Sequence, residues 1–219
     1  TSGDALNKRG YRTWVGEAPI RETLAAALVR LSGWQPDQVF YDPCCGTGTL
    51  LIEAALLAIN QAPGVNRGFV METWPQMDKA VMTRLRQEAK AQRMKDVSLQ
   101  IRGSDIDPEA IKLCEKHIRQ AGLEGKIQVE LKDLRDLRLP EEKICFVTNP
   151  PYGERIGDRK KAAMVAKSLG TLLKQHPQAS LNVITADPAF ERQAQIRAEK
   201  RRRLYNGRLE CEFLTIRNS

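Results

Sequence analysis

The 219-residue sequence predicts an α/β fold, namely a mostly parallel, mixed sheet with helices on both faces and an antiparallel hairpin at its C-terminal edge. Strand-like apolar runs alternate with helix-like segments, and this order is typical of parallel strands joined by covering helices. The last strand-like stretch is divided by Asn206-Gly207, the strongest two-residue signal for a hairpin turn.

Short β-branched and aromatic runs mark the strands, and apolar residues at helical spacing mark the helices. The expected strands cover residues 39–42, 99–105, 126–131, 143–148 and 179–185, with the hairpin over 199–216. The expected helices cover about 20–31, 48–60, 77–93, 108–121 and 162–174. The fourth helix is the best defined, because Asp107 can cap it, Pro108 suits its first turn and Gly122 can close it.

The chain divides into an N-terminal extension with its own helix, residues 1–34, and an α/β domain, residues 35–219. An inserted helical segment, at about 61–94, separates the first helix of that domain from its second strand. Because the first residue is Thr1 rather than Met, we expect a piece of a longer protein.

Composition narrows the class of protein. Lys and Arg outnumber Asp and Glu by 35 to 27, a net charge of +8 that suits a polyanion such as RNA or DNA. A basic surface without such a partner is the alternative.

No apolar run approaches the roughly 20 residues of a membrane span, and no leader opens the sequence. Five cysteines without CxxC spacing indicate a reduced, cytoplasmic protein, and the two distant histidines predict no metal site.

The stretch "DPCCGTGTLL", residues 42–51, joins the first strand to its helix. Gly46 and Gly48 permit a tight turn and let the backbone approach a ligand at the start of the helix. Leu51 replaces the last glycine of the dinucleotide fingerprint, which disfavours a nicotinamide dehydrogenase. An acid before such a turn suits a ligand with nucleoside and amino-acid parts, and a purely structural turn is the alternative.

Acidic residues follow the next two strands. Asp105 stands at the carboxyl end of the second strand, where a carboxylate can accept hydrogen bonds from ribose hydroxyls. The insertion accounts for a distance from the glycine turn that exceeds the usual ~20 residues. Capping of the following helix is enough to explain Asp107. Asp133 either reaches an adenine amino group or is an exposed loop acid.

The fourth strand runs directly into "NPPY", residues 149–152. Two acceptors, the side-chain oxygen of Asn149 and the carbonyl of Pro150, can take the two N–H groups of an exocyclic amine and aim its lone pair at a methyl donor. The prolines hold that carbonyl still, which is the preorganisation such catalysis requires. Tyr152 offers a face on which a base can stack. A rigid loop with a core-facing tyrosine is the alternative.

These motifs, in this order, resemble the class I S-adenosylmethionine-dependent methyltransferases, and more closely the catalytic domain of bacterial THUMP-containing 23S rRNA guanine-N2 methyltransferases. Five segments carry the resemblance: "SGDALNKRGYR" (2–12), "APIRETLAAAL" (18–28), "DPCCGTGTLLIEAA" (42–55), "GSDIDPEAI" (103–111) and "NPPYGERIGD" (149–158). It implies a Rossmann-like, seven-stranded sheet ordered 3-2-1-4-5-7-6, S-adenosylmethionine as the cofactor, 23S rRNA as the partner, and a THUMP RNA-binding domain before residue 1.

The resemblance also implies the site residues. The cofactor-binding residues would be Asp42, Cys44, Gly46, Thr47, Gly48, Asp105, Ile106, Asp133, Leu134 and Asn149. The catalytic residues would be Asn149, Pro150, Pro151 and Tyr152, and Pro19 to Glu22 would close over the methionine end, or be solvated first-turn charges. Contacts to RNA phosphates would come from Lys8, Arg9, Arg12, Arg155, residues 158–161, and Lys200 to Arg203 unless that last run protects a sheet edge.

Two functional alternatives remain open. NPPY suits any exocyclic amine, so the target can equally be adenine N6 in DNA or RNA. A catalytically silent RNA-binding module would keep the fold and lose the chemistry, although the intact Asn149 and glycine turn count against it.

Overall fold

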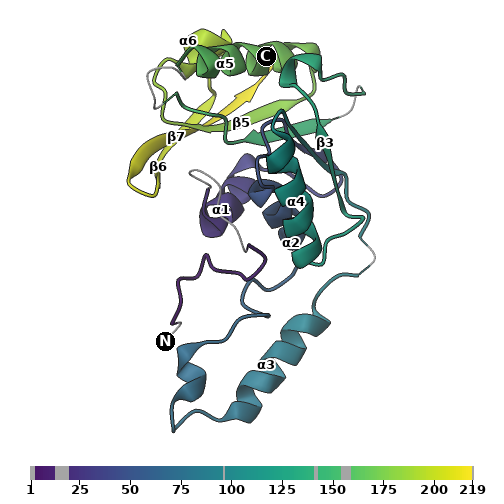
Figure 1. Ribbon diagram of the computed structural model, residues 1–219, viewed down its shortest axis with the longest axis vertical. Coiled ribbons are helices and arrows are strands. Elements are labelled where there is room, and N and C mark those ends of the chain that lie inside the picture. Colours follow the sequence, from purple (N-terminus) through teal and green to yellow (C-terminus); the bar gives the residue numbers. More distant parts are fainter. Residues whose placement is uncertain (1–2, 13–19, 96, 141–142, 154–158, 219) are drawn as a thin grey trace.

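The computed structural model describes residues 3–12, 20–95, 97–140, 143–153 and 159–218. Within these ranges the strands form one seven-stranded sheet in the order β3-β2-β1-β4-β5-β7-β6 (Figure 1). Strands β1 to β5 pair in parallel, whereas β7 runs antiparallel between β5 and β6. The predicted fold class and strand order are confirmed.

The observed elements agree with the expected ones to within three residues at each end. The strands are β1 (Val39–Asp42), β2 (Ile101–Asp105), β3 (Ile127–Leu131), β4 (Ile144–Thr148), β5 (Ser180–Thr185), β6 (Lys200–Asn206) and β7 (Leu209–Arg217). The helices are α1 (Glu22–Ser32), α2 (Thr49–Ala58), α3 (Lys79–Ala91), α4 (Pro108–Gln120), α5 (Arg159–Gln175) and α6 (Phe190–Ala194), with short 3-10 turns η1 (Val70–Thr73) and η2 (Leu134–Asp136). The sequence analysis missed α6, because five residues are too few to show a helical period.

Both faces of the central sheet are buried. Helices α1, α2 and α4 cover one face, and α5 and α6 cover the other (Figure 1). Successive residues of β4 alternate between the two cores, so that Val147 packs on the first side and Phe146 on the second. This double burial explains why the central strands β1 and β4 are nearly continuous apolar runs rather than polar alternations.

The carboxyl ends of β1, β2, β3 and β4 meet at one edge of the sheet. In the parallel register Asp42 lies opposite Gly103, and Asp105 lies opposite Leu131. The residues that directly follow these strand ends therefore converge. In open α/β sheets this edge is where ligands bind, so it is the place to look for a site.

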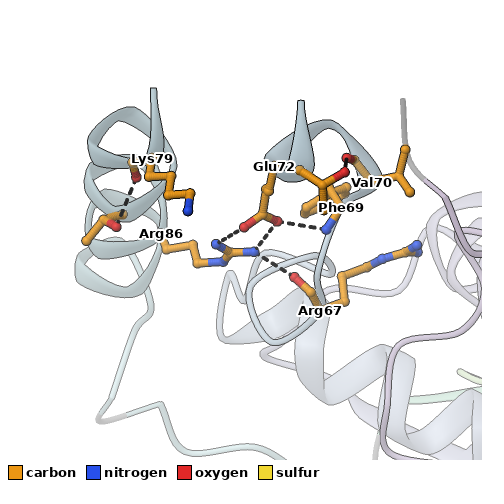
Figure 2. A network of polar contacts seen from close by, with 8 residues as sticks. Arg67, Phe69, Val70, Glu72, Lys79 and Arg86 are labelled. Atoms are coloured by element: carbon orange, nitrogen blue, oxygen red, sulfur yellow. Dashed lines mark hydrogen bonds and ion pairs between the residues drawn. The ribbon is translucent and has the colours of Figure 1, made fainter. Parts of the chain in front are cut away.

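The inserted segment, residues 61–94, forms an arm that projects away from the sheet next to the N-terminal end of the chain (Figure 1). The amide of Met94 donates to the carbonyl of Ile59 (2.9 Å), which closes the base of the arm. Inside the arm the guanidinium of Arg86 forms a two-pronged ion pair with Glu72, at 2.6 and 2.7 Å (Figure 2). Arg67 donates to the carbonyls of residues 4 and 5, which fastens the N-terminal segment to the arm.

The state of the cysteines and the character of the helices bear on two further expectations. All five cysteines are free thiols in the structure. Among the described helices, none combines the length and the apolar character that crossing a bilayer demands.

Candidate functional site

The turn between β1 and α2 is built on two glycines with left-handed backbone. Gly46 has φ 50° and Gly48 has φ 83°, a region that side-chain-bearing residues rarely adopt. A Cβ at Gly48 would lie 2.4 Å from the sulfur of Cys114, so this glycine lets α4 pack against the turn. A Cβ at Gly46 would meet nothing within 4 Å. The backbone at Gly46 is therefore open to a ligand, whereas Gly48 serves packing.

Asp42 is buried at the start of this turn. Its carboxylate accepts a hydrogen bond from the amide of Cys44 (3.1 Å), and its residue is only 1% exposed. Burial raises the pKa of Asp42 to about 7, and the charge of Asp105 acts in the same direction. The Thr148 hydroxyl and the Cys44 amide oppose that rise without cancelling it. Asp42 thus changes charge near neutral pH.

Asp105 ties the glycine turn to the loop after β2. One carboxylate oxygen accepts from the amide of Gly46 (2.8 Å), and the other accepts from the amide of Asp107 (3.0 Å). The neighbouring Ile106 is 65% exposed, an unusual fraction for isoleucine. Asp107 caps α4 through the amide of Glu109 (2.9 Å), as predicted.

Asp133 follows β3 on the same edge. The amide of Lys132 donates to the carbonyl of Asp105 (2.9 Å), so the two acidic loops lie side by side. The carboxylate of Asp133 accepts from the amide and the guanidinium of Arg135, which lowers its pKa. Asp133 also caps η2, whose first residue Leu134 packs against the second core. In this structure Asp133 thus has a partner within its own loop.

Asn149 follows β4, which pairs with β1, so it emerges at the same edge as the glycine turn. The preceding residue, Thr148, is buried beside Asp42. The side-chain oxygen of Asn149 accepts a hydrogen bond from the hydroxyl of Tyr152. Pro150 is buried and Pro151 is exposed. The structure therefore brings the NPPY segment and the glycine turn together.

A buried acid on α2 was not anticipated. Glu53 is fully buried and is met by the hydroxyl of Tyr11 (2.7 Å) and the guanidinium of Arg9 (2.8 Å). Burial raises the pKa of Glu53 to about 7, although Arg9 and Tyr11 act against the rise. An acid in the otherwise apolar stretch "LLIEAALL" was the signal that could have revealed this contact.

The same network revises two predicted RNA contacts. The side chain of Arg9 is 11% exposed, and that of Arg12 is 9% exposed and pairs with Glu22 at 3.4 Å. Glu22 is itself buried rather than a solvated first-turn charge. These arginines fasten the N-terminal segment to the helices. Lys8 is exposed and pairs with Asp4 (3.3 Å).

The remaining predicted contacts divide into three groups. Lys200 to Arg203 lie on β6, the edge strand, where Arg201 pairs with Glu191 (2.9 Å) and Arg203 pairs with Glu210 (3.2 Å). These two pairs favour the edge-charge interpretation for half of the run. Residues 159–161 open α5. Three predicted residues lie outside the described part of the chain: Pro19, Arg155 and Asp158.

Gly103 on β2 is a further site residue that the sequence did not reveal. A Cβ there would lie 2.7 Å from the side chain of Leu51 and 3.1 Å from the carbonyl of Asp42. The absence of a side chain lets α2 and the glycine turn sit directly on the strand. Such a requirement depends on three segments meeting, and a single glycine in a strand-like run does not disclose it.

Comparison with known proteins places the chain among methyltransferases. The chain matches the UPF0020 family, "RMKL-like, methyltransferase domain", over residues 9–215. It is 40% identical over 213 residues to the Bacillus subtilis protein named "Putative RNA methyltransferase YpsC". That match covers 97% of this chain and 55% of the relative, so the chain spans little more than half the length of the protein it resembles.

Solved structures share the whole architecture. SMU.472, a methyltransferase by its name, was crystallised with S-adenosylhomocysteine and matches with a TM-score of 0.94 at 40% identity, covering 100% of this chain and 57% of that one. A Listeria monocytogenes protein named as an N6-adenine-specific DNA methylase matches with a TM-score of 0.93 at 41% identity, covering 100% and 56%. The bound S-adenosylhomocysteine of SMU.472 confirms the expected type of cofactor for this fold.

Proposed function

This chain belongs to the RMKL-like methyltransferase domain family, and on that premise we propose that it methylates the exocyclic N2 amine of a guanine in 23S rRNA. The observation that carries the proposal is the position of Asn149, at the end of β4 and on the same sheet edge as the glycine turn. The net charge of +8 and the name of the Bacillus relative support an RNA substrate. Guanine N2 and 23S rRNA rest on the resemblance of the motifs.

The residues at this edge fit S-adenosylmethionine. The open backbone at Gly46 allows a ligand to approach the turn, and the exposed Ile106 offers an apolar surface for an adenine ring. Asp105 would hold the ribose hydroxyls, and Asp133 would accept from the adenine amine. Asp42 would lie near the methionine part of the cofactor, which carries a positively charged ammonium. When bound, the cofactor supplies an electrophilic methyl group on a sulfonium.

The NPPY segment would act on the base. The oxygens of Asn149 and Pro150 would accept the two N–H groups of the amine, turning its lone pair toward the methyl group. In the structure the hydroxyl of Tyr152 donates to the side-chain oxygen of Asn149. An arriving amine would therefore replace this hydrogen bond between Tyr152 and Asn149. The aromatic ring of Tyr152 would then stack on the base. The amine loses its proton readily once alkylated, so no strong base is required.

Adenine N6 is the second candidate, because the Listeria relative bears that name and NPPY accepts either amine. A single experiment separates the two. The full-length protein is incubated with labelled S-adenosylmethionine and unmodified 23S rRNA or DNA, and the nucleosides are then analysed. We expect label in N2-methylguanosine from rRNA. Label in N6-methyladenine would select the second candidate, and a protein that binds S-adenosylhomocysteine yet labels neither substrate would refute both.

A further inference from the structure

A hollow of about 470 Å³ lies at the base of the arm, where its first and last turns meet the loop before β3. The lining residues are Gln61, Ala62, Val65, Asn66, Ala89, Lys90, Arg93, Met94, Lys95 and Lys126. Four of these are cationic and none is acidic. Its volume lies in the range of sites that hold small ligands or part of a larger one.

The cations around the hollow differ from two arginines elsewhere in the arm, which have acidic partners. Arg86 is neutralised by Glu72, and Arg84 lies 3.7 Å from Glu88. In the part of the chain that the structure describes, no ion pair is formed by the four cations of the hollow, Lys90, Arg93, Lys95 and Lys126. Their positive charge is therefore available to an anion.

Backbone carbonyls orient two of these cations without neutralising them. The ammonium of Lys126 donates to the carbonyls of Lys95 (3.3 Å) and Val97 (3.4 Å). Among the described residues, the guanidinium of Arg93 donates one long bond, 3.5 Å, to the carbonyl of Gly122, and this leaves most of its five N–H donors for a ligand. Both side chains are half-buried, so they are partly ordered before any ligand arrives.

The hollow lies at the opposite end of the sheet from the candidate catalytic site. Lys95 and Lys126 precede β2 and β3, whereas Asp105 and Asp133 stand at or after the ends of those strands. Each strand has five residues, so the two ends are roughly 15 Å apart or more. A molecule that occupied both places must be extended and must carry charge along its length.

We infer that this hollow binds the phosphodiester backbone of the RNA substrate and anchors it at a distance from the reacting base. The four cations supply the electrostatic attraction that phosphates require, and the side-chain amides of Gln61 and Asn66 can bond sugar or phosphate oxygens. The apolar part of the lining, with Val65 and Met94, suits the sugar carbons. The inference rests on the proposed function, because it assumes that the substrate is RNA.

The test compares two double charge reversals in the full-length protein. Lys90→Glu with Lys95→Glu alters two exposed cations of the hollow. Lys167→Glu with Lys174→Glu makes the same change in charge at two exposed positions of α5, on the other face of the sheet. Binding of 23S rRNA fragments is measured from 50 to 300 mM KCl, and the affinity for S-adenosylhomocysteine reports on the fold.

We expect the hollow variant to bind RNA about tenfold more weakly and to lose about two units of the slope of log K against log salt. S-adenosylhomocysteine affinity should stay unchanged, and the α5 variant should bind RNA like the wild type. An unchanged slope, or an equal loss in the α5 variant, would overturn the inference. Failure of the wild-type protein to methylate RNA would instead reject the proposed function, so the two failures are distinguishable.

Discussion

The two ends of the sheet are built in different ways. At the carboxyl end, the glycine turn and the acidic loops are joined by hydrogen bonds of 2.8 to 3.1 Å between carboxylates and backbone amides. At the amino end lies the arm, which is held together internally by an ion pair between Arg86 and Glu72, whose side chains are about a quarter exposed. The first end is part of the core, and the second is an attachment to it.

This difference indicates how each end responds to change. A perturbation at the carboxyl end alters packing that several elements share, so it should affect chemistry or global stability. A perturbation in the arm should remain local, because neither apolar core, among the described residues, includes a residue of the arm. The predictions below test this contrast, beginning with the largest effect.

Substituting Asn149→Ala should reduce methyl transfer roughly 100- to 1,000-fold, the usual effect of removing one preorganised polar group from an active site. S-adenosylhomocysteine affinity should fall far less than transfer does, because the lost oxygen acts mainly on the base. Single-turnover transfer and calorimetric titration measure the two quantities. Asn149→Asp keeps an acceptor oxygen and should retain more activity than the alanine variant; equal loss in both would argue against the acceptor role.

The two glycines of the turn should differ in their effect on stability. Gly48→Ala imposes a strained backbone and a contact with Cys114, so it should lower the free energy of unfolding by about 3 kcal/mol. Gly46→Ala imposes only the backbone strain and should cost about 1 kcal/mol. Denaturant unfolding of both variants measures the difference. Equal destabilisation would mean that packing against α4 is not what requires Gly48.

The contrast between the two ends also explains what could be predicted from the sequence. Elements such as α4 have local signals, namely a capping acid, a proline and a closing glycine, and all were found where expected. NPPY and the glycine turn were found because each is a continuous motif whose chemistry depends on neighbouring residues. The roles of Gly103 and Glu53 were missed because they arise only when distant segments meet.

Charged residues were the least predictable from sequence. Arg9 and Lys90 are both basic residues in polar stretches, yet the first is buried against Glu53 and the second faces the hollow without an ion pair among the described residues. Net charge favours a class of partner but does not say which cations are free to meet it. Pairing depends on tertiary contacts.

Cofactor binding should depend on pH through Asp42. With its pKa raised to about 7, this carboxyl is largely protonated at pH 6 and ionised at pH 8. Bound S-adenosylhomocysteine carries an ammonium that favours the ionised form, so affinity should rise about tenfold from pH 6 to pH 8. Asp42→Asn should give a flat profile over that range. A wild-type affinity that stays constant would remove Asp42 from the cofactor site.

The smallest effect should come from the arm. The Arg86 guanidinium lowers the pKa of Glu72 to about 2. The ion pair therefore stabilises the arm at any pH above the ordinary pKa of a glutamate, and this stabilisation is lost as the pH falls through about 2. Removing the guanidinium by Arg86→Ala should therefore speed hydrogen exchange of the α3 amides at neutral pH, without changing exchange in α2. Arg84→Ala is the matched control, because its side chain is 68% exposed on the same helix and lies 3.7 Å from its acid. If exchange in α2 accelerated together with α3, the arm would be part of the cooperative core, and the distinction between the two ends of the molecule would fail.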